Sequence, residues 1–239
     1  MTFTLENWPL LLKGAGLTLQ LAIGAFFIGA LLALPLALLR IYGNKLASGI
    51  VRVLISFLRG TPMLAQLFLV YYGAGQFRPQ LQALGLWTFL REPYFCALLT
   101  FTLNTAAYQA EILRGGIRAV PAGEVEAAKA ISMSFGLQLR RIICPHAYRI
   151  AMPALGNELI LMIKGSAIAS VVTLLDLMGQ ARLIFARTFD FGIYLQAAIL
   201  YLVISFAVVR LWRLLEWWSA PQFRRPVPTS NPVTTGGQP

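Results

Sequence analysis

The sequence predicts an all-α integral membrane protein, and its composition, its long uncharged runs and the placement of its basic residues all support that fold class. Of its 239 residues, 58% are hydrophobic and 12% are charged, and the mean hydropathy is +0.69. Soluble domains are ordinarily about 45–50% apolar and about 25% charged. A soluble core cannot take up so much apolar sequence, so we expect most of the chain to lie in a bilayer.

Long apolar runs with few charges have about the length that a helix needs to cross the hydrocarbon core. We expect about five transmembrane helices, over residues 15–39, 53–75, 93–114, 152–178 and 191–213. The first run stays uncharged as far as Leu39, which is too long for the apolar core of a signal peptide, so we expect a retained span. The second and fourth runs contain polar residues, and such helices belong inside a bundle.

The 20 Lys and Arg residues divide unequally between the two sides of these spans. One side holds 14 of them and the other holds five, with Lys164 inside a span. The smaller set is Lys13, Arg78, Arg91, Arg182 and Arg187. Because loops rich in Lys and Arg stay in the cytoplasm, we expect the amino terminus outside the cell and the carboxyl terminus inside it.

The last twenty residues differ in composition from the rest. From about Ala220 the sequence is dominated by Pro, Ser, Thr, Gly and Gln, and it lacks the apolar groups that offset chain entropy. We therefore expect a transmembrane domain over residues 1–219 and a disordered cytoplasmic tail over residues 220–239.

Composition also excludes several classes of function. The net charge of +11 is spread over several loops, so it does not form the single basic surface that binds nucleic acid. Cys96 and Cys144 fall near opposite sides of the membrane, and His146 is the only histidine, which supports neither a disulfide framework nor a metal site. No Gly-x-x-x-x-Gly-Lys-Ser/Thr motif is present, so the chain does not hydrolyse ATP itself.

The largest hydrophilic segment, residues 115–149, is expected to lie in the cytoplasm and to hold two short helices. Pro121 can start the first helix, Gly136 can stop it, and residues 137–148 form the second. The first helix carries Glu126 and several small side chains, so the groove of another protein could approach its backbone closely. A helix lying on lipid headgroups is the alternative.

Several short motifs resemble those of one family. The motifs are Arg59-Gly60-Thr61-Pro62, Asn104-Thr105-Ala106-Ala107-Tyr108, residues 111–117, Glu126-Ala127-Ala128, Ile143-Cys144-Pro145 and Asn157-Glu158. Together they resemble the permease subunits of bacterial ATP-binding-cassette (ABC) importers, in the branch for polar amino acids. Residues 71–77 and 187–190 look most like the arginine-transporter permeases. The resemblance extends to about Trp218, with departures at Ser132, where the family usually has Gly, and at Cys144, where it usually has Leu.

The resemblance implies an importer subunit of the bacterial inner membrane that moves polar, arginine-like amino acids by alternating access. Its implied partners are a dimer of ABC ATPase subunits, which binds ATP and Mg, a second permease subunit that is a paralogue or another copy, and an extracytoplasmic substrate-binding protein. The implied ATPase-coupling (EAA) loop includes Gly123, Glu126, Ala127, Ala128, Ser132, Ile143 and Pro145. No cofactor is expected in the chain itself.

Glu158 is the residue we single out for substrate contact, because an ionisable group inside a span usually faces a pathway. An ion pair with a neighbouring helix is the alternative, and Lys164 is not its simple partner because it lies about 120° around the helix. Gly165 returns to the Glu158 face and leaves space beside the carboxylate, which suits a ligand ammonium or guanidinium. The candidate substrate site is Asn157, Glu158, Lys164, Gly165 and Ser166.

Two other readings compete with the importer. Glu158 could carry a proton or cation in an ion-coupled secondary transporter, or the chain could be a noncatalytic scaffold subunit. Glu111 and Arg114 lie three residues apart near the cytoplasmic end of a span, and we expect a local ion pair between them rather than transport chemistry. A membrane enzyme is not expected, because few acid and base groups are present.

Overall fold

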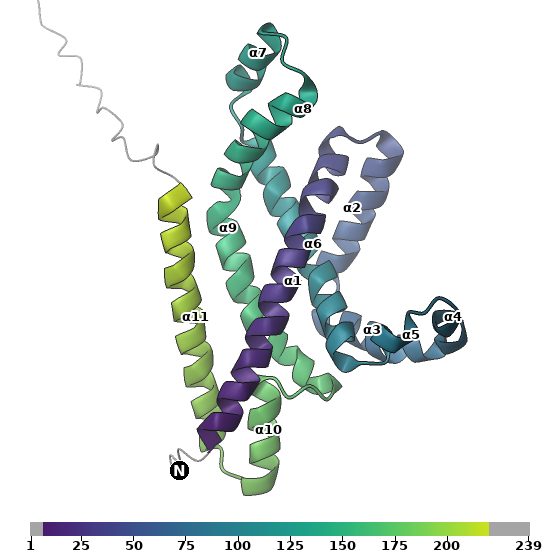
Figure 1. Cartoon of the computed structure of the whole chain (residues 1–239), viewed down its shortest axis with the longest axis vertical. Coiled ribbons are helices and arrows are strands. Elements are labelled where there is room, and N and C mark those ends of the chain that lie inside the picture. Colours follow the sequence, from purple (N-terminus) through teal and green to yellow (C-terminus); the bar gives the residue numbers. More distant parts are fainter. Residues whose placement is uncertain (1–6, 220–239) are drawn as a thin grey trace, which may run out of the picture.

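The computed structural model describes residues 7–219, which form helices and connecting turns without a strand (Figure 1). The helices are α1 (Trp8–Tyr42), α2 (Lys45–Gly60), α3 (Met63–Gln76), α4 (Arg78–Ala83), α5 (Trp87–Leu90), α6 (Pro93–Arg118), α7 (Ala122–Ala130), α8 (Phe135–Gln138), α9 (Cys144–Gly165), α10 (Leu177–Thr188) and α11 (Gly192–Ser219). A π-helical turn precedes α9 and a 3-10 segment, Ser166–Val172, follows it. The all-α fold class is confirmed, and the tail expected over residues 220–239 lies outside the described residues.

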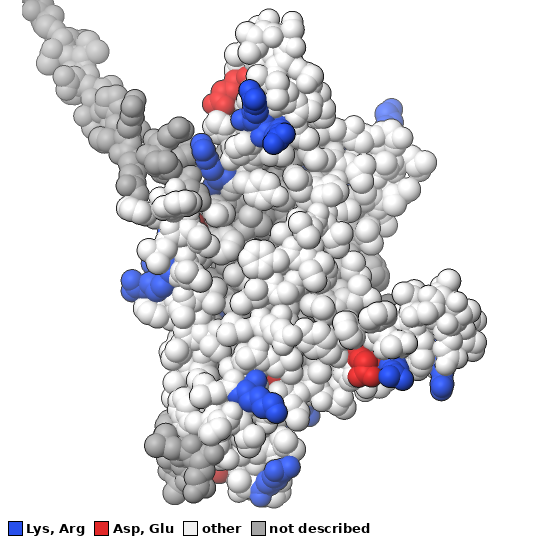
Figure 2. All heavy atoms as spheres, viewed as in Figure 1, with Lys and Arg blue, Asp and Glu red and all other residues white. Residues whose placement is uncertain are grey.

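The helices long and apolar enough to cross a membrane are fewer than the five expected spans. Three helical stretches are long and apolar enough: Trp8–Tyr42, Gly192–Trp218, and Phe135–Val172, which runs from α8 through α9 to the 3-10 segment. The bent pair of α2 and α3 makes a fourth if it counts as one span. The expected span over 93–114 corresponds to α6, which is 26 residues long but carries buried polar side chains from Thr100 to Gln109. Figure 2 shows a surface that is mostly uncharged.

Helix α1 packs along α6 in the middle of the bundle. Pro9 stands in its first turn, where a missing N–H costs nothing, and the helix ends at Tyr42, just before Gly43. Small residues let the two helices approach closely. A Cβ added at Gly29 would lie 2.6 Å from Thr105 Cγ2 and 3.2 Å from the backbone nitrogen of Ala106, both on α6. Only a glycine therefore fits at this crossing.

The span expected over 53–75 is two helices that meet at a bend of 102°. The bend lies at the break between Gly60 and Met63, so this segment does not cross as one straight rod. The first of the two helices begins eight residues earlier than expected, at Lys45, where the Asn44 side chain accepts a hydrogen bond from the Ala47 N–H.

The two helices expected in the hydrophilic segment differ from prediction in their ends. Helix α7 stops at Ala130, six residues before Gly136, and Gly136 lies inside the short α8. The chain turns at Ser132, whose φ of 55° is left-handed. This is the position where the family usually has Gly, so a serine here adopts a backbone conformation that glycine reaches more easily. The second expected helix does not end at Tyr148, because α9 runs on from Cys144 to Gly165.

Helices α10 and α11 form a second core with the start of α1. Asp176 is fully buried, and its Oδ1 accepts a hydrogen bond from the Gly179 N–H at 3.0 Å. It therefore caps α10. Helix α11 is tied to α9 by the Trp212 indole, which donates to the Met152 carbonyl at 2.9 Å.

We predict that Gly29→Leu lowers the free energy of unfolding in detergent by about 1–3 kcal/mol, because the added side chain forces α1 and α6 apart. Gly16→Leu is the matched control, since a Cβ at Gly16 has no atom within 4 Å and the helix is the same. Thermal or denaturant unfolding of both variants checks the prediction. Equal losses in the two would show that the crossing does not depend on close approach.

Candidate functional site

The site is built around the break between α2 and α3. In a continuous helix the Leu58 carbonyl would accept a hydrogen bond from the N–H of residue 62, but Pro62 has no N–H. The last hydrogen bond of α2 is therefore the one from the Thr61 N–H to the Phe57 carbonyl. Unsatisfied carbonyl groups are costly at membrane depth, so the break requires donors from elsewhere.

Side-chain amides from α3 and α6 supply those donors. Gln66 Nε2 donates to the Leu58 carbonyl at 2.7 Å and to Thr61 Oγ1 at 2.8 Å. Asn104 Nδ2 donates to the same Leu58 carbonyl at 3.1 Å and to Gln66 Oε1 at 3.2 Å. The Tyr108 hydroxyl donates to the Arg59 carbonyl at 3.4 Å. The break is therefore fixed against α6 by two amides and one phenol.

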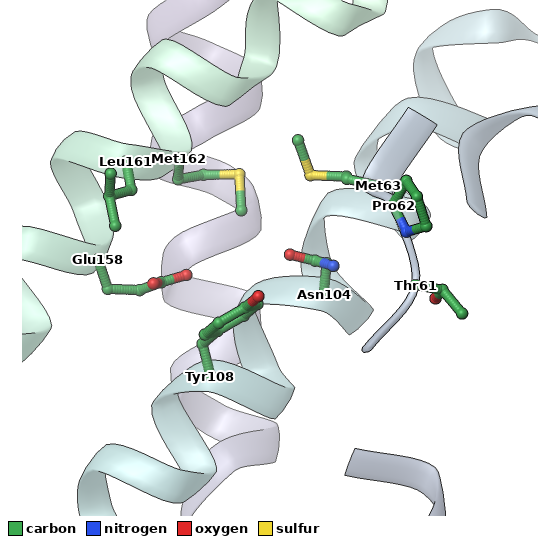
Figure 3. A pocket seen from close by; sticks show the side chains of 8 residues that line it. All are labelled: Thr61, Pro62, Met63, Asn104, Tyr108, Glu158, Leu161 and Met162. Atoms are coloured by element: carbon green, nitrogen blue, oxygen red, sulfur yellow. The ribbon is translucent and has the colours of Figure 1, made fainter. Parts of the chain in front are cut away.

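A pocket of about 320 Å³ opens beside this break, between α3, α6 and α9. Its lining residues are Thr61, Pro62, Met63, Asn104, Tyr108, Glu158, Leu161 and Met162. Figure 3 shows the polar ends of Asn104, Tyr108 and Glu158 directed toward one space, with the Met63 and Met162 thioethers along one side. The pocket combines one carboxylate with an amide, a phenol and flexible apolar side chains.

Glu158 is 6% exposed and its carboxylate is held from α6. The Thr105 hydroxyl donates to Glu158 Oε1 at 3.0 Å, and Gln109 Nε2 donates to the Thr105 oxygen at 3.0 Å and to the Phe26 carbonyl at 3.0 Å. This chain of hydrogen bonds links α1, α6 and α9. Among the described residues Glu158 makes no ion pair, so the alternative of a structural salt bridge does not hold within residues 7–219.

The other four residues of the expected substrate site do not line this pocket. Asn157 and Lys164 are exposed, and the fully buried Ser166 donates to the Ile163 carbonyl at 2.8 Å. Gly165 lies at the edge, because a Cβ there would come within 3.0 Å of Met63 Cε. The structure thus brings only Glu158 of that set into the pocket. It adds Thr61, Asn104 and Tyr108, polar residues that the sequence shows inside apolar runs.

Charged groups cluster on the side of the pocket toward the end of α6. Glu111 pairs with Arg40 of α1 and with Arg114 at 2.9 Å, and it lies 3.9 Å from Arg59. The expected local pair between Glu111 and Arg114 is present, but it is one part of a cluster that joins three helices. The Arg59 guanidinium also lies 5.0 Å from the Tyr108 ring centroid. The cluster therefore touches the pocket through Arg59 and Tyr108.

The segment expected to couple to an ATPase projects from one end of the bundle (Figure 1). Gly123, Glu126 and Ala127 on α7 and Ser132 after it are exposed, whereas Ala128 is 3% exposed and faces inward. Ile143 is also 3% exposed, and Pro145 stands in the first turn of α9. Gln138 Nε2 donates to the Met133 carbonyl at 2.6 Å and closes the turn. The segment is thus an ordered pair of short helices, and Ala128 is the one buried residue of α7.

No group of three or more His, Cys, Asp and Glu residues that could hold a metal ion occurs in the part of the chain that the structure describes. Glu158 is the one carboxylate in the pocket lining, and in the loop Glu124 of α7 pairs with His146 of α9 at 3.2 Å. The geometry fits binding and passage of a polar molecule.

Comparison with known proteins identifies the family. Residues 25–218 match the family model described as "Binding-protein-dependent transport system inner membrane component". The chain is 44% identical to a nopaline transport system permease protein of Agrobacterium fabrum, over 95% of each chain. It is 41% identical to an octopine transport system permease protein of Rhizobium meliloti, over 99% of this chain and 95% of that one. It is also 35% identical to an arginine ABC transporter permease protein of Escherichia coli, over 88% of this chain and 95% of that one.

Solved structures agree with these relatives. An amino acid ABC transporter crystallised with histidines aligns with a TM-score of 0.78 at 34% identity, over 91% of this chain and 100% of the other. An inward-facing methionine ABC transporter shares the fold, with a TM-score of 0.74 at 18% identity over 92% of this chain and 99% of that one. ATP hydrolysis in such transporters belongs to a separate ATPase. The chain therefore belongs to the family of binding-protein-dependent transport system inner membrane components, the permease subunits of ABC transporters.

Proposed function

We propose that this permease carries amino acids with a cationic, guanidinium-type side chain inward across the bacterial inner membrane, by alternating access around the Glu158 pocket. The observation that carries the proposal is the single buried carboxylate in that pocket, oriented by Thr105 and without a basic partner among the described residues. Family membership supports an ATP-driven importer and argues against the ion-coupled and scaffold alternatives.

The chemistry of the pocket favours that substrate class. Oxygen Oε1 of Glu158 accepts a hydrogen bond from Thr105, which leaves Oε2 for a ligand that brings its own donors. A guanidinium offers several N–H groups in one plane and forms strong charge-assisted hydrogen bonds with a carboxylate. Nopaline, octopine and arginine, the compounds named for three of the relatives, all contain a guanidinium group. The Glu158 carboxylate, in the middle of α9, therefore suits the guanidinium group that these three compounds share.

The proposed orientation places the α7–α8 end of the molecule in the cytoplasm. Figure 1 shows α7 and α8 at one end, with α10 and the start of α1 at the other. The elements that carry the smaller basic set lie away from α7 and α8 in Figure 1: the first turns of α1 with Lys13, the start of α4 with Arg78, the turn before α6 with Arg91, and α10 with Arg182 and Arg187. The positive-inside rule then puts the loop on the inner side and the substrate-binding protein on the outer side.

We propose that the loop from Gly123 to Pro145 docks onto an ABC ATPase dimer that binds ATP and Mg. Its exposed face carries Glu126 and Ala127, and the buried Ala128 and Ile143 fix it to the bundle. Helix α7 follows α6 and precedes α9 in the chain, and those two helices supply most of the pocket wall. A force on α7 therefore reaches both sides of the pocket through short, ordered connections.

The proposed assembly contains a second permease subunit, either a paralogue or another copy of this chain. Helix α2 leaves large apolar side chains uncovered, with Leu46 at 73%, Val53 at 70% and Phe57 at 53% exposed. Lipid and a partner helix both suit such a surface. Two subunits give a transport path more helices than the described residues of one chain supply.

We predict that Glu158→Gln lowers ATP-dependent uptake of labelled arginine at least about tenfold, because a charge-assisted hydrogen bond contributes about 1.5–3 kcal/mol. The uptake is measured in vesicles that contain the complete transporter, and copurification of the ATPase checks that the complex still assembles. Lys164→Gln is the comparison variant, since it removes a charge from the same helix outside the pocket, and we expect uptake within about twofold of wild type. Wild-type uptake by Glu158→Gln would refute the assignment.

We predict that Glu126→Lys weakens copurification with the ATPase at least about tenfold, because it reverses the charge at the centre of the proposed docking face. Glu92→Lys is the matched control, since it makes the same charge change at a 52% exposed side chain away from the loop. Pull-down of the ATPase with the tagged permease gives the readout. Undiminished recovery with Glu126→Lys would place the ATPase contact elsewhere.

A further inference from the structure

A second pocket lies at the end of α11, far from the substrate pocket in the sequence and on a helix that does not line it. A pocket of about 440 Å³ is lined by Arg210, Arg213, Leu214 and Trp217. At about 100° per residue these four side chains fall on one face of the helix, within about 100° of one another. Two guanidinium groups, an aliphatic side chain and an indole therefore line one pocket.

The position of the site along α11 coincides with a membrane boundary. The helix carries no charge from Gly192 to Val209, a length of about 27 Å at 1.5 Å per residue. A hydrocarbon core is about 30 Å thick, so Arg210 falls where the headgroups begin. Trp217, two turns further on, is of a residue type that favours this interface. In Figure 1 this end of α11 points the same way as α7 and α8, the end proposed to face the cytoplasm.

The two arginines are available for an anion. Arg210 lies 4.7 Å from the Phe206 ring centroid and makes no ion pair with a described residue, and Arg213 makes none either. They stand three residues apart, about 4.5 Å along the helix axis, so both guanidinium groups can reach one phosphate. Leu214, which is 64% exposed, offers apolar surface beside them.

We propose that this pocket binds the phosphate headgroup of an anionic phospholipid of the inner leaflet, with Arg210 and Arg213 on the phosphate and with Leu214 against the glycerol and upper acyl chain. The apolar half of the lining is what selects a lipid over free phosphate. The position at the headgroup level is what selects a lipid over a soluble acidic protein. This site goes beyond the transport function and does not depend on which substrate the permease carries.

The test is native mass spectrometry of the complete transporter in detergent, titrated with phosphatidylglycerol and, separately, with phosphatidylcholine. Wild type is expected to retain phosphatidylglycerol preferentially. Arg210→Gln/Arg213→Gln is expected to lose at least about tenfold in that affinity, because each basic residue near an anionic surface contributes about a factor of five. The control is Lys45→Gln/Arg52→Gln, which removes two exposed positive charges from α2 and is expected to keep the affinity.

Each other outcome overturns the proposal. Equal losses in the two double variants would show a delocalised attraction to the whole basic surface. An unchanged affinity in Arg210→Gln/Arg213→Gln would place the lipid elsewhere. Displacement of the lipid by millimolar inorganic phosphate would show a general anion site, and loss of ATPase copurification without loss of lipid would show a protein contact instead.

Discussion

The structure depends on how the chain satisfies one backbone carbonyl at membrane depth. Pro62 removes the N–H that would pair with the Leu58 carbonyl, and a carbonyl left unpaired within a membrane span is costly. The amides of Gln66 and Asn104 take over, at 2.7 and 3.1 Å. Because Asn104 belongs to α6, the break between α2 and α3 is held at a fixed place on the central helix.

The pocket follows from that arrangement. The 102° bend lies at Thr61, Pro62 and Met63, and these three residues form the wall of the pocket that Glu158 also lines. The same helix α6 orients Glu158 through Thr105 and ends in the Glu111 cluster, next to the segment that leads into α7. Helix α6 therefore connects the break, the carboxylate and the proposed ATPase-docking loop, which is the physical path that the proposed alternating access requires.

The sequence predicted the fold class and the family, because composition and motifs are local signals, and it singled out Glu158 as a charge inside an apolar run. It did not predict which residues meet Glu158. Asn157 and Lys164 are neighbours in the chain but are exposed, while Asn104 and Tyr108 reach the pocket from another helix. The ends of α7 and α9 were missed for a similar reason, since Ser132 adopts a left-handed φ that propensity does not reveal and packing against α6 continues α9 through Tyr148.

The central claim, that a shared amide network holds the break, is tested most directly by a double-mutant cycle of Gln66→Leu and Asn104→Leu. Free energies of unfolding in detergent are measured for wild type, both single variants and the double variant. Since both amides donate to the Leu58 carbonyl and Asn104 also donates to Gln66, the account predicts a coupling free energy of about 0.5–3 kcal/mol. Losses that simply add would contradict it and would mean that the two amides act independently of each other.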